Sequence, residues 1–113
     1  AKSIKLAKIN SQNNQLDNTT FIFGDMHNPK LNLDFSQFNK VIVDPPRSGL
    51  DQQLITLLNN QGFEKLVYVS CNPATLARDL AKLAKSYIIK QLTLVDMFSN
   101  TYHVECVVEL IKK

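Results

Sequence analysis

Cys71 stands at a point where a buried strand is expected to end and a helix to begin. Residues 66–69 are an apolar run of β-branched and aromatic side chains, which is typical of a strand buried in a parallel sheet. Asn72 can cap a following helix, and Pro73 suits the first helical turn, where a missing N–H costs nothing. The positive end of a helix dipole and unpaired backbone N–H groups favour thiolate over thiol. We therefore predict that Cys71 is a nucleophile, with a small buried hydrophobe as the alternative.

Two carboxylates occupy positions that also favour chemistry. Asp44 follows the apolar run 41–43 and precedes two prolines, which restrict the backbone and hold the carboxylate in a fixed attitude. Glu105 stands at the beginning of an otherwise apolar run. Ligands of open parallel sheets bind beyond the carboxyl ends of the strands, so Asp44 and Cys71 are expected to line one crevice. The alternatives are a turn-forming aspartate and an exposed glutamate at the rim.

Three polar segments follow one another along the chain in a specific order. Residues 70–79 read Ser-Cys-Asn-Pro-Ala-Thr-Leu-Ala-Arg-Asp, residues 44–50 read Asp-Pro-Pro-Arg-Ser-Gly-Leu, and residues 96–105 run from an aspartate to Glu105. They resemble, respectively, the nucleophile motif, the D-P-P-R-x-G motif and the D-x-F-P-x-T-x-H-V-E motif of the uracil-5-methyltransferases that act on RNA. Ser99 stands where that family usually has proline. The resemblance covers most of the chain.

The resemblance implies a covalent mechanism in which Cys71 and Glu105 have different tasks. Carbon 5 of uracil is a poor nucleophile, so its methylation needs an activating step. A Cys71 thiolate adds at carbon 6 and turns carbon 5 into an enolate that can attack a sulfonium methyl group. The adduct must then lose its carbon 5 proton to a base before the thiolate can leave. Glu105 is the expected base.

The resemblance also implies S-adenosylmethionine as the cofactor and RNA as the partner. Asp44 is expected to contact the cofactor and the target region, and Asp25 matches an acidic position near the adenine of the cofactor. Arg47 has forked donors suited to a phosphate or a carboxylate, although a solvated surface arginine is the alternative. His103, two residues before Glu105 in a strand, is expected to orient the base or the RNA unless it is structural.

Two other classes of function remain open at this point. An amino-group methyltransferase uses a related D-P-P-Y strand end, but Arg47 argues against it, and Cys71 and Glu105 would then have no role. A non-catalytic RNA-binding module is the second alternative. Measuring whether the chain binds S-adenosylmethionine separates the cases. Residues 74–79 look closer to the 23S rRNA branch of the family than to the tRNA branch, so rRNA is the expected substrate.

Composition is consistent with a single small cytoplasmic domain. The chain has 113 residues, of which 44% are hydrophobic and 20% are charged, enough for a modest core. The net charge of +3 is compatible with a polyanionic partner and is too small to demonstrate one. Cys71 and Cys106 have no metal-ligand spacing and are expected to be free thiols in a reducing compartment. No apolar run is long enough to span a membrane.

Apolar periodicity predicts strands and helices that alternate along most of the chain. Gly62 is expected to end one of these helices, and Gly24 with Asp25 is expected to follow the first strand. The predicted elements are a helix over 3–14, strands over 19–23, 40–43, 65–69, 87–95 and 104–111, and helices after residues 50 and 72.

This alternation predicts an α/β fold with a mostly parallel sheet covered on both faces, and with antiparallel last strands because their link is only turn-sized. It resembles the end of a Rossmann-like methyltransferase sheet. The three glycines form no G-x-G loop, so residues 1–113 are expected to be the carboxyl-terminal portion of a class I methyltransferase catalytic domain, without its first strands and cofactor loop. Alone, these residues are expected to be inactive. They should either dimerise through an exposed sheet edge or leave residues 1–39 poorly ordered.

Overall fold

The computed structural model describes residues 2–24, 33–97, 99–101 and 104–113. The chain divides into two units, Ala1–Leu33 and Asp34–Lys113. Asp25 and His103, which the sequence singles out, lie outside the described ranges. None of the described helices is long and apolar enough to cross a membrane.

The first unit contains helix α1, Lys2–Asn13, which agrees with the helix predicted over residues 3–14. A hydrogen bond of 3.1 Å from the Asn14 amide to the Asn10 carbonyl continues the last turn. Gln15 then leaves the helix in the left-handed region, at a φ of 54°. The helix therefore ends in the run of asparagine and glutamine, where amide side chains compete with the helical backbone.

The prediction of a strand over residues 19–23 is wrong. These residues have no regular secondary structure and take no place in the sheet of the described chain. Ile22 is 55% exposed and Phe23 is 70% exposed. A run of β-branched and aromatic residues expresses a preference, but a strand gains its stability from a paired neighbour and a buried face. Residues 19–23 have neither among the described residues.

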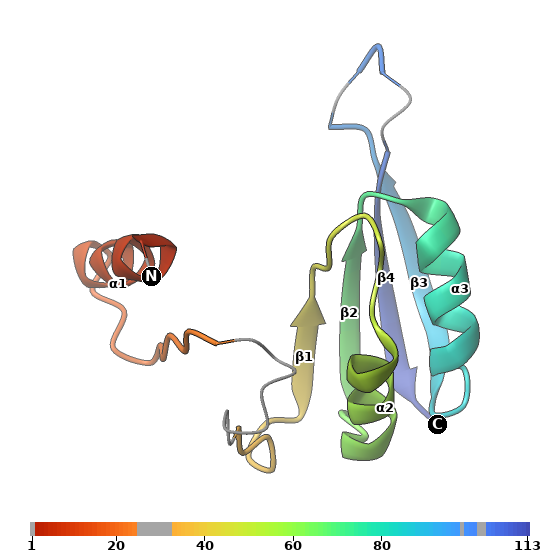
Figure 1. The fold of residues 1–113 in the computed structure, drawn as a ribbon, viewed down its shortest axis with the longest axis horizontal. Helices are drawn as coiled ribbons and strands as arrows, with labels where there is room; N and C mark the ends of the chain where they lie inside the picture. Colours follow the sequence, from red (N-terminus) through yellow and green to blue (C-terminus); the bar gives the residue numbers. More distant parts are fainter. Residues whose placement is uncertain (1, 25–32, 98, 102–103) are drawn as a thin grey trace. The chain divides into compact units, whose positions relative to one another are not determined.

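The second unit is built on a four-stranded sheet. Its strands are β1 (Lys40–Val43), β2 (Lys65–Ser70), β3 (Tyr87–Val95) and β4 (Glu105–Lys112). They lie in the order β1-β2-β4-β3, and β4 runs antiparallel to both of its neighbours while β1 and β2 are parallel (Figure 1). The α/β fold with an antiparallel last strand is thus confirmed. Among the described residues the sheet is mixed rather than mostly parallel, because only one of its three strand pairs, β1 with β2, is parallel.

Two capped helices connect the parallel strands. Helix α2, Gln52–Gln61, begins where the Asp51 side chain accepts a hydrogen bond from the Leu54 amide, and it ends at Gly62 with a φ of 61°. Helix α3, Pro73–Leu83, begins with Asn72 as its cap. Both ends that the sequence predicted, the stop at Gly62 and the start at Asn72, are therefore confirmed.

The expected helical cover on both faces of the sheet is not found within residues 34–113. Strands β2 and β4 alternate between fully buried side chains on one face and half-buried ones on the other. Because the chain advances in one direction from β1 to β2 and onward, right-handed crossovers bring both helices to the same face. The core between the helices and the sheet contains Leu50, Ile55, Leu58, Phe63, Leu66, Tyr68, Leu76, Leu83, Tyr87, Cys106, Val108 and Leu110.

Candidate active site at the carboxyl ends of the strands

The carboxyl ends of β1, β2 and β3 meet the amino end of β4 at one end of the sheet, at the top of Figure 1. Asp44 directly follows β1, Cys71 directly follows β2, and Asp96 directly follows β3. Glu105 is the first residue of β4. The sheet therefore brings a thiol and three carboxyl groups, from different segments of the sequence, to one end of its strands.

The register of β2 and β4 brings Cys71 and Glu105 to the same end of the β2–β4 ladder. The last pair of that ladder is Ser70 with Cys106, and Cys71 and Glu105 are the next residues along the two segments. Both residues are half-buried, which leaves the thiol and the carboxylate partly accessible. A ligand at this edge could contact both.

The two thiols of the chain have different surroundings. Cys106 is only 2% exposed and belongs to the core. Burial, and to a smaller extent the charge of Glu105, raises the pKa of the Cys106 thiol, so this thiol stays protonated at neutral pH. Cys71 is partly exposed at the start of a helix. Of the two, Cys71 is the one that can meet an external electrophile.

Hydrogen bonds fix the backbone on both sides of Cys71. The Ser70 hydroxyl accepts from the Asn72 amide and donates to the Asn72 carbonyl, each at 3.1 Å. The Asn72 side chain in turn accepts from the Ala74 amide at 3.1 Å and caps α3. Cys71 is thus held between the end of a strand and the first turn of a helix, where backbone N–H groups point outward.

Residues 44–50 form a turn, the 44–50 turn, that is tied to the same helix. The Arg47 carbonyl accepts from the Asn72 side-chain amide and from the Thr75 hydroxyl, each at 3.1 Å. Asp44 and Arg47 are both exposed residues of this turn. The turn that carries Asp44 and the segment that carries Cys71 therefore have a fixed relation to each other.

Four residues of this arrangement were not predicted from the sequence to hold the 44–50 turn. Asn72 was assigned only as a cap, and Thr75, Arg78 and Asp79 were read only as part of a motif, yet all four bond to the 44–50 turn. A usable signal was present, because residues three, four and seven positions apart share one face of a helix. Asn72, Thr75 and Asp79 have this spacing.

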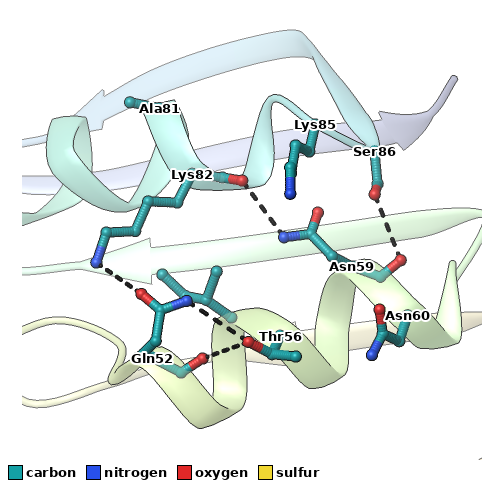
Figure 2. A pocket seen from close by; sticks show the side chains of 9 residues that line it. Gln52, Thr56, Asn59, Asn60, Ala81, Lys82, Lys85 and Ser86 are labelled. Atoms are coloured by element: carbon teal, nitrogen blue, oxygen red, sulfur yellow. Dashed lines mark hydrogen bonds between the residues drawn. The ribbon is translucent and has the colours of Figure 1, made fainter.

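A cleft with a volume of about 700 Å³ lies elsewhere, between α2 and α3. Lys82 reaches Gln52 at 3.2 Å, and Asn59 donates to the Lys82 carbonyl at 3.3 Å, so much of its polar lining is already paired (Figure 2). Asp44, Cys71 and Glu105 do not line this cleft. No group of three or more His, Cys, Asp or Glu among the described residues could hold a metal ion.

The fold and the strand-end groups define an α/β protein of the methyltransferase class. The structure of the tRNA (uracil-54, C5)-methyltransferase from Pyrococcus abyssi, in complex with S-adenosyl-L-homocysteine, superposes with a TM-score of 0.81 and 39% sequence identity. That likeness covers 96% of this chain and 26% of the Pyrococcus chain.

The sequence comparison identifies the family. The model of the family described as tRNA (Uracil-5-)-methyltransferase matches residues 26–113. The chain belongs to this family, which confirms the resemblance carried by the three motifs.

Curated relatives agree and are much longer than this chain. A protein of Listeria monocytogenes named an uncharacterized RNA methyltransferase is 50% identical over 111 residues, or 96% of this chain and 24% of the relative. A protein of Clostridium tetani with the same description is 44% identical over 95% of this chain and 24% of its own length. The chain therefore spans about a quarter of the length of these relatives.

Proposed function

We propose that this chain supplies the nucleophile and the base of an S-adenosylmethionine-dependent methyltransferase that modifies carbon 5 of a uridine in RNA. The observation that carries the proposal is the position of Cys71 and Glu105 at the adjoining ends of β2 and β4, directly next to the last ladder pair, Ser70 with Cys106. The substrate is taken to be 23S rRNA rather than tRNA, because residues 74–79 resemble the rRNA branch. An RNA substrate also favours a cytoplasmic location.

The Cys71 thiolate attacks carbon 6 of the uracil ring and forms a carbon–sulfur bond. The electron pair of the ring double bond moves toward the carbonyl at carbon 4, which makes carbon 5 nucleophilic. When bound, S-adenosylmethionine supplies a methyl group on a sulfonium centre. Glu105 then removes the carbon 5 proton, the double bond re-forms, and the Cys71 thiolate leaves. One residue thus activates the ring and the other restores it.

The remaining site residues are assigned to binding. Asp44 is an exposed carboxylate at the end of β1, and it fits the hydroxyl or ammonium groups of the cofactor. Asp25 is assigned to the cofactor by resemblance alone. Arg47, exposed on the 44–50 turn, is assigned to RNA phosphate, and His103 is assigned to the RNA or the base by resemblance.

Residues 1–113 are taken as the carboxyl-terminal portion of a class I catalytic domain. Their three glycines form no G-x-G loop, so these residues alone should bind S-adenosylmethionine undetectably and be inactive. Strand β1 is an edge of the sheet, and pairing of β1 edges would give a dimer. Calorimetry with the cofactor and light scattering test both statements, and micromolar binding by a monomer would contradict them.

Covalent trapping tests the nucleophile in the protein at its full natural length. RNA with 5-fluorouridine at the target should form a stable adduct with the parent protein, because fluorine cannot be removed as a proton can. Cys71→Ala should form none and should retain cofactor binding. Cys106→Ala is the matched control, since it removes the buried thiol and should still be trapped. An adduct with Cys71→Ala, or methyl transfer by it at a comparable rate, would reject the assignment.

Glu105→Gln tests the base separately. Addition and methyl transfer should proceed while proton removal stalls, so a methylated covalent enzyme–RNA complex should accumulate. Glu109→Gln is the control on the same strand, where Glu109 pairs with Lys65 at 2.6 Å. Mass spectrometry that finds no such complex for Glu105→Gln, together with near-normal turnover, would remove Glu105 from the mechanism.

A further inference from the structure

Asp79 is a carboxylate buried inside the second unit, with 0% of its surface exposed. Its Oδ2 atom accepts from the Leu50 amide at 2.7 Å and from the Tyr68 hydroxyl at 2.8 Å. Its Oδ1 atom accepts from Nε and Nη2 of Arg78 at 2.9 and 2.8 Å. A buried carboxylate is tolerated only when such donors surround it. These donors come from three segments: the 44–50 turn, β2 and α3 itself.

Arg78 extends this network along the 44–50 turn. Its Nη2 atom also donates to the Ser48 carbonyl at 2.8 Å and to the Leu50 carbonyl at 3.3 Å. The Arg47 carbonyl is also bonded, to Asn72 and Thr75 at the start of α3. Three residues of the turn, Arg47, Ser48 and Leu50, are therefore bonded to the helix or its cap. The turn is therefore fixed at several points by polar bonds, in addition to the apolar packing of Leu50.

Gly49 shows how closely the turn approaches the network. It has a φ of +78°, a conformation that side chains of L-residues rarely adopt. A Cβ atom at this position would lie 2.5 Å from Oδ2 of Asp79 and 2.6 Å from Nη2 of Arg78. The backbone of the turn thus passes directly over the carboxylate and guanidinium groups.

Tyr68 connects the same carboxylate to the strand that ends at Cys71. Its hydroxyl lies in the core, and burial, followed by the hydrogen bond to Asp79, raises the pKa of Tyr68 far above its usual value. Tyr68 therefore remains a hydrogen-bond donor at every working pH. Cys71 lies three residues after Tyr68 and two residues before α3, so it sits between two of the segments that Asp79 joins.

We propose that Asp79 is a positioning residue, which fixes Cys71 relative to the 44–50 turn through its bonds to Tyr68, Arg78 and Leu50. This inference rests on the function proposed above. A buried ion pair is weak support for stability, because apolar side chains often pack as well. The hydrogen bonds of Asp79 instead fix the positions of the segments that they join. A displacement of about 1 Å in a catalytic group can lower the reaction rate by up to 100-fold.

Two buried tyrosines provide a matched test at the protein's full natural length. Tyr68→Phe removes the hydroxyl bonded to Asp79, and Tyr87→Phe removes a hydroxyl that donates to the Leu58 carbonyl at 3.0 Å. Both side chains are almost completely buried. Tyr68→Phe should lose more stability than Tyr87→Phe, because a hydrogen bond to a charged group contributes more than one to a carbonyl. The measurement is the rate of adduct formation with saturating 5-fluorouridine RNA, at a temperature where every variant is folded.

Tyr68→Phe should form the adduct roughly 10-fold more slowly than the parent, and Asp79→Asn should be slower still. Tyr87→Phe should match the parent in both the rate of adduct formation and cofactor binding. Tyr68→Phe carries the test if Asp79→Asn does not fold. An unchanged rate for Tyr68→Phe, or an equal loss in Tyr87→Phe, would overturn the positioning role. A parent protein that forms no adduct would instead overturn the proposed function.

Discussion

Each unit of the chain contains a helix predicted from apolar periodicity, but the two helices bury their apolar side chains to different extents. In α1, Leu6 is 53% exposed and Ile9 is 40% exposed. In α3, Leu76 is 3% exposed and Leu83 is 0% exposed. Both segments form the helix that their periodicity predicts, but only α3 packs on a sheet of its own unit. Helix formation therefore follows local sequence, whereas burial depends on which other segments are paired nearby.

The largest expected difference between the units comes from truncating one apolar side chain in each. Leu66→Ala creates a cavity under α2 and α3, because Leu66 is 0% exposed, and should lower the free energy of unfolding by about 3 kcal/mol. Ile9→Ala removes a side chain that is 40% exposed and adds a better helix former, so it should change stability by less than about 0.5 kcal/mol. Urea unfolding measures both, and equal losses would show that α1 is part of the same core.

Local signals explain which elements could be predicted from the sequence. The stop at Gly62 and the start at Asn72 follow from backbone rules that involve only a few adjacent residues. The strand expected over residues 19–23 failed because strand pairing depends on distant segments. In the second unit both described helices lie on one face of the sheet, because the side on which a helix lies depends on the order of the strands.

The candidate site divides in the same way. Motif resemblance selected Cys71 and Glu105, but only the register of β2 and β4 reveals that the two residues lie at the same end of one strand pair. Asp79 was not selected, because an acidic residue in an amphipathic helix normally faces solvent. Its burial depends on the Tyr68 hydroxyl and the Leu50 amide, which lie 11 and 29 positions away in sequence.

A smaller contrast is expected from the two left-handed residues that follow helices in the two units. Gly62 has a φ of 61°, so Gly62→Ala should destabilise the second unit by about 1 kcal/mol. Gln15 has a φ of 54° with a full side chain, so Gln15→Gly should relieve strain after α1 and raise its helicity. Thermal unfolding and circular dichroism test the pair. A stabilising Gly62→Ala would contradict the assignment of this cap.

The cap of α2 gives an effect of similar or smaller size. Asp51 accepts from the Leu54 amide at 2.9 Å, so Asp51→Ala should cost about 1 kcal/mol by leaving that amide without its partner. Asp51→Asn keeps an acceptor of the same shape and should cost much less. Urea unfolding of the two variants separates the hydrogen bond from the charge. If both variants lost equal stability, the charge of Asp51 rather than the cap would matter.

The smallest effect is expected in the first unit, at the one side chain that α1 buries. Ser11 is 7% exposed, and its hydroxyl donates to the Leu16 carbonyl at 2.9 Å and lies 2.6 Å from the Thr19 hydroxyl. Ser11→Ala should release the segment after the helix, because it removes the hydroxyl that bonds to Leu16 and Thr19. The Leu16 amide, which bonds to the Ser11 carbonyl at 3.0 Å, then reports the opening.

If the free energy of this local opening falls by about 1 kcal/mol, the Leu16 amide should exchange roughly fivefold faster. Ser3→Ala is the control, since Ser3 is exposed in the same helix. Amide exchange should detect the change while the urea midpoint of the second unit stays fixed, because the Ser11 bonds stay within residues 11–19. A shift of that midpoint would show that the two units unfold together. The two units would then differ in the exposure of their apolar side chains but not in their unfolding.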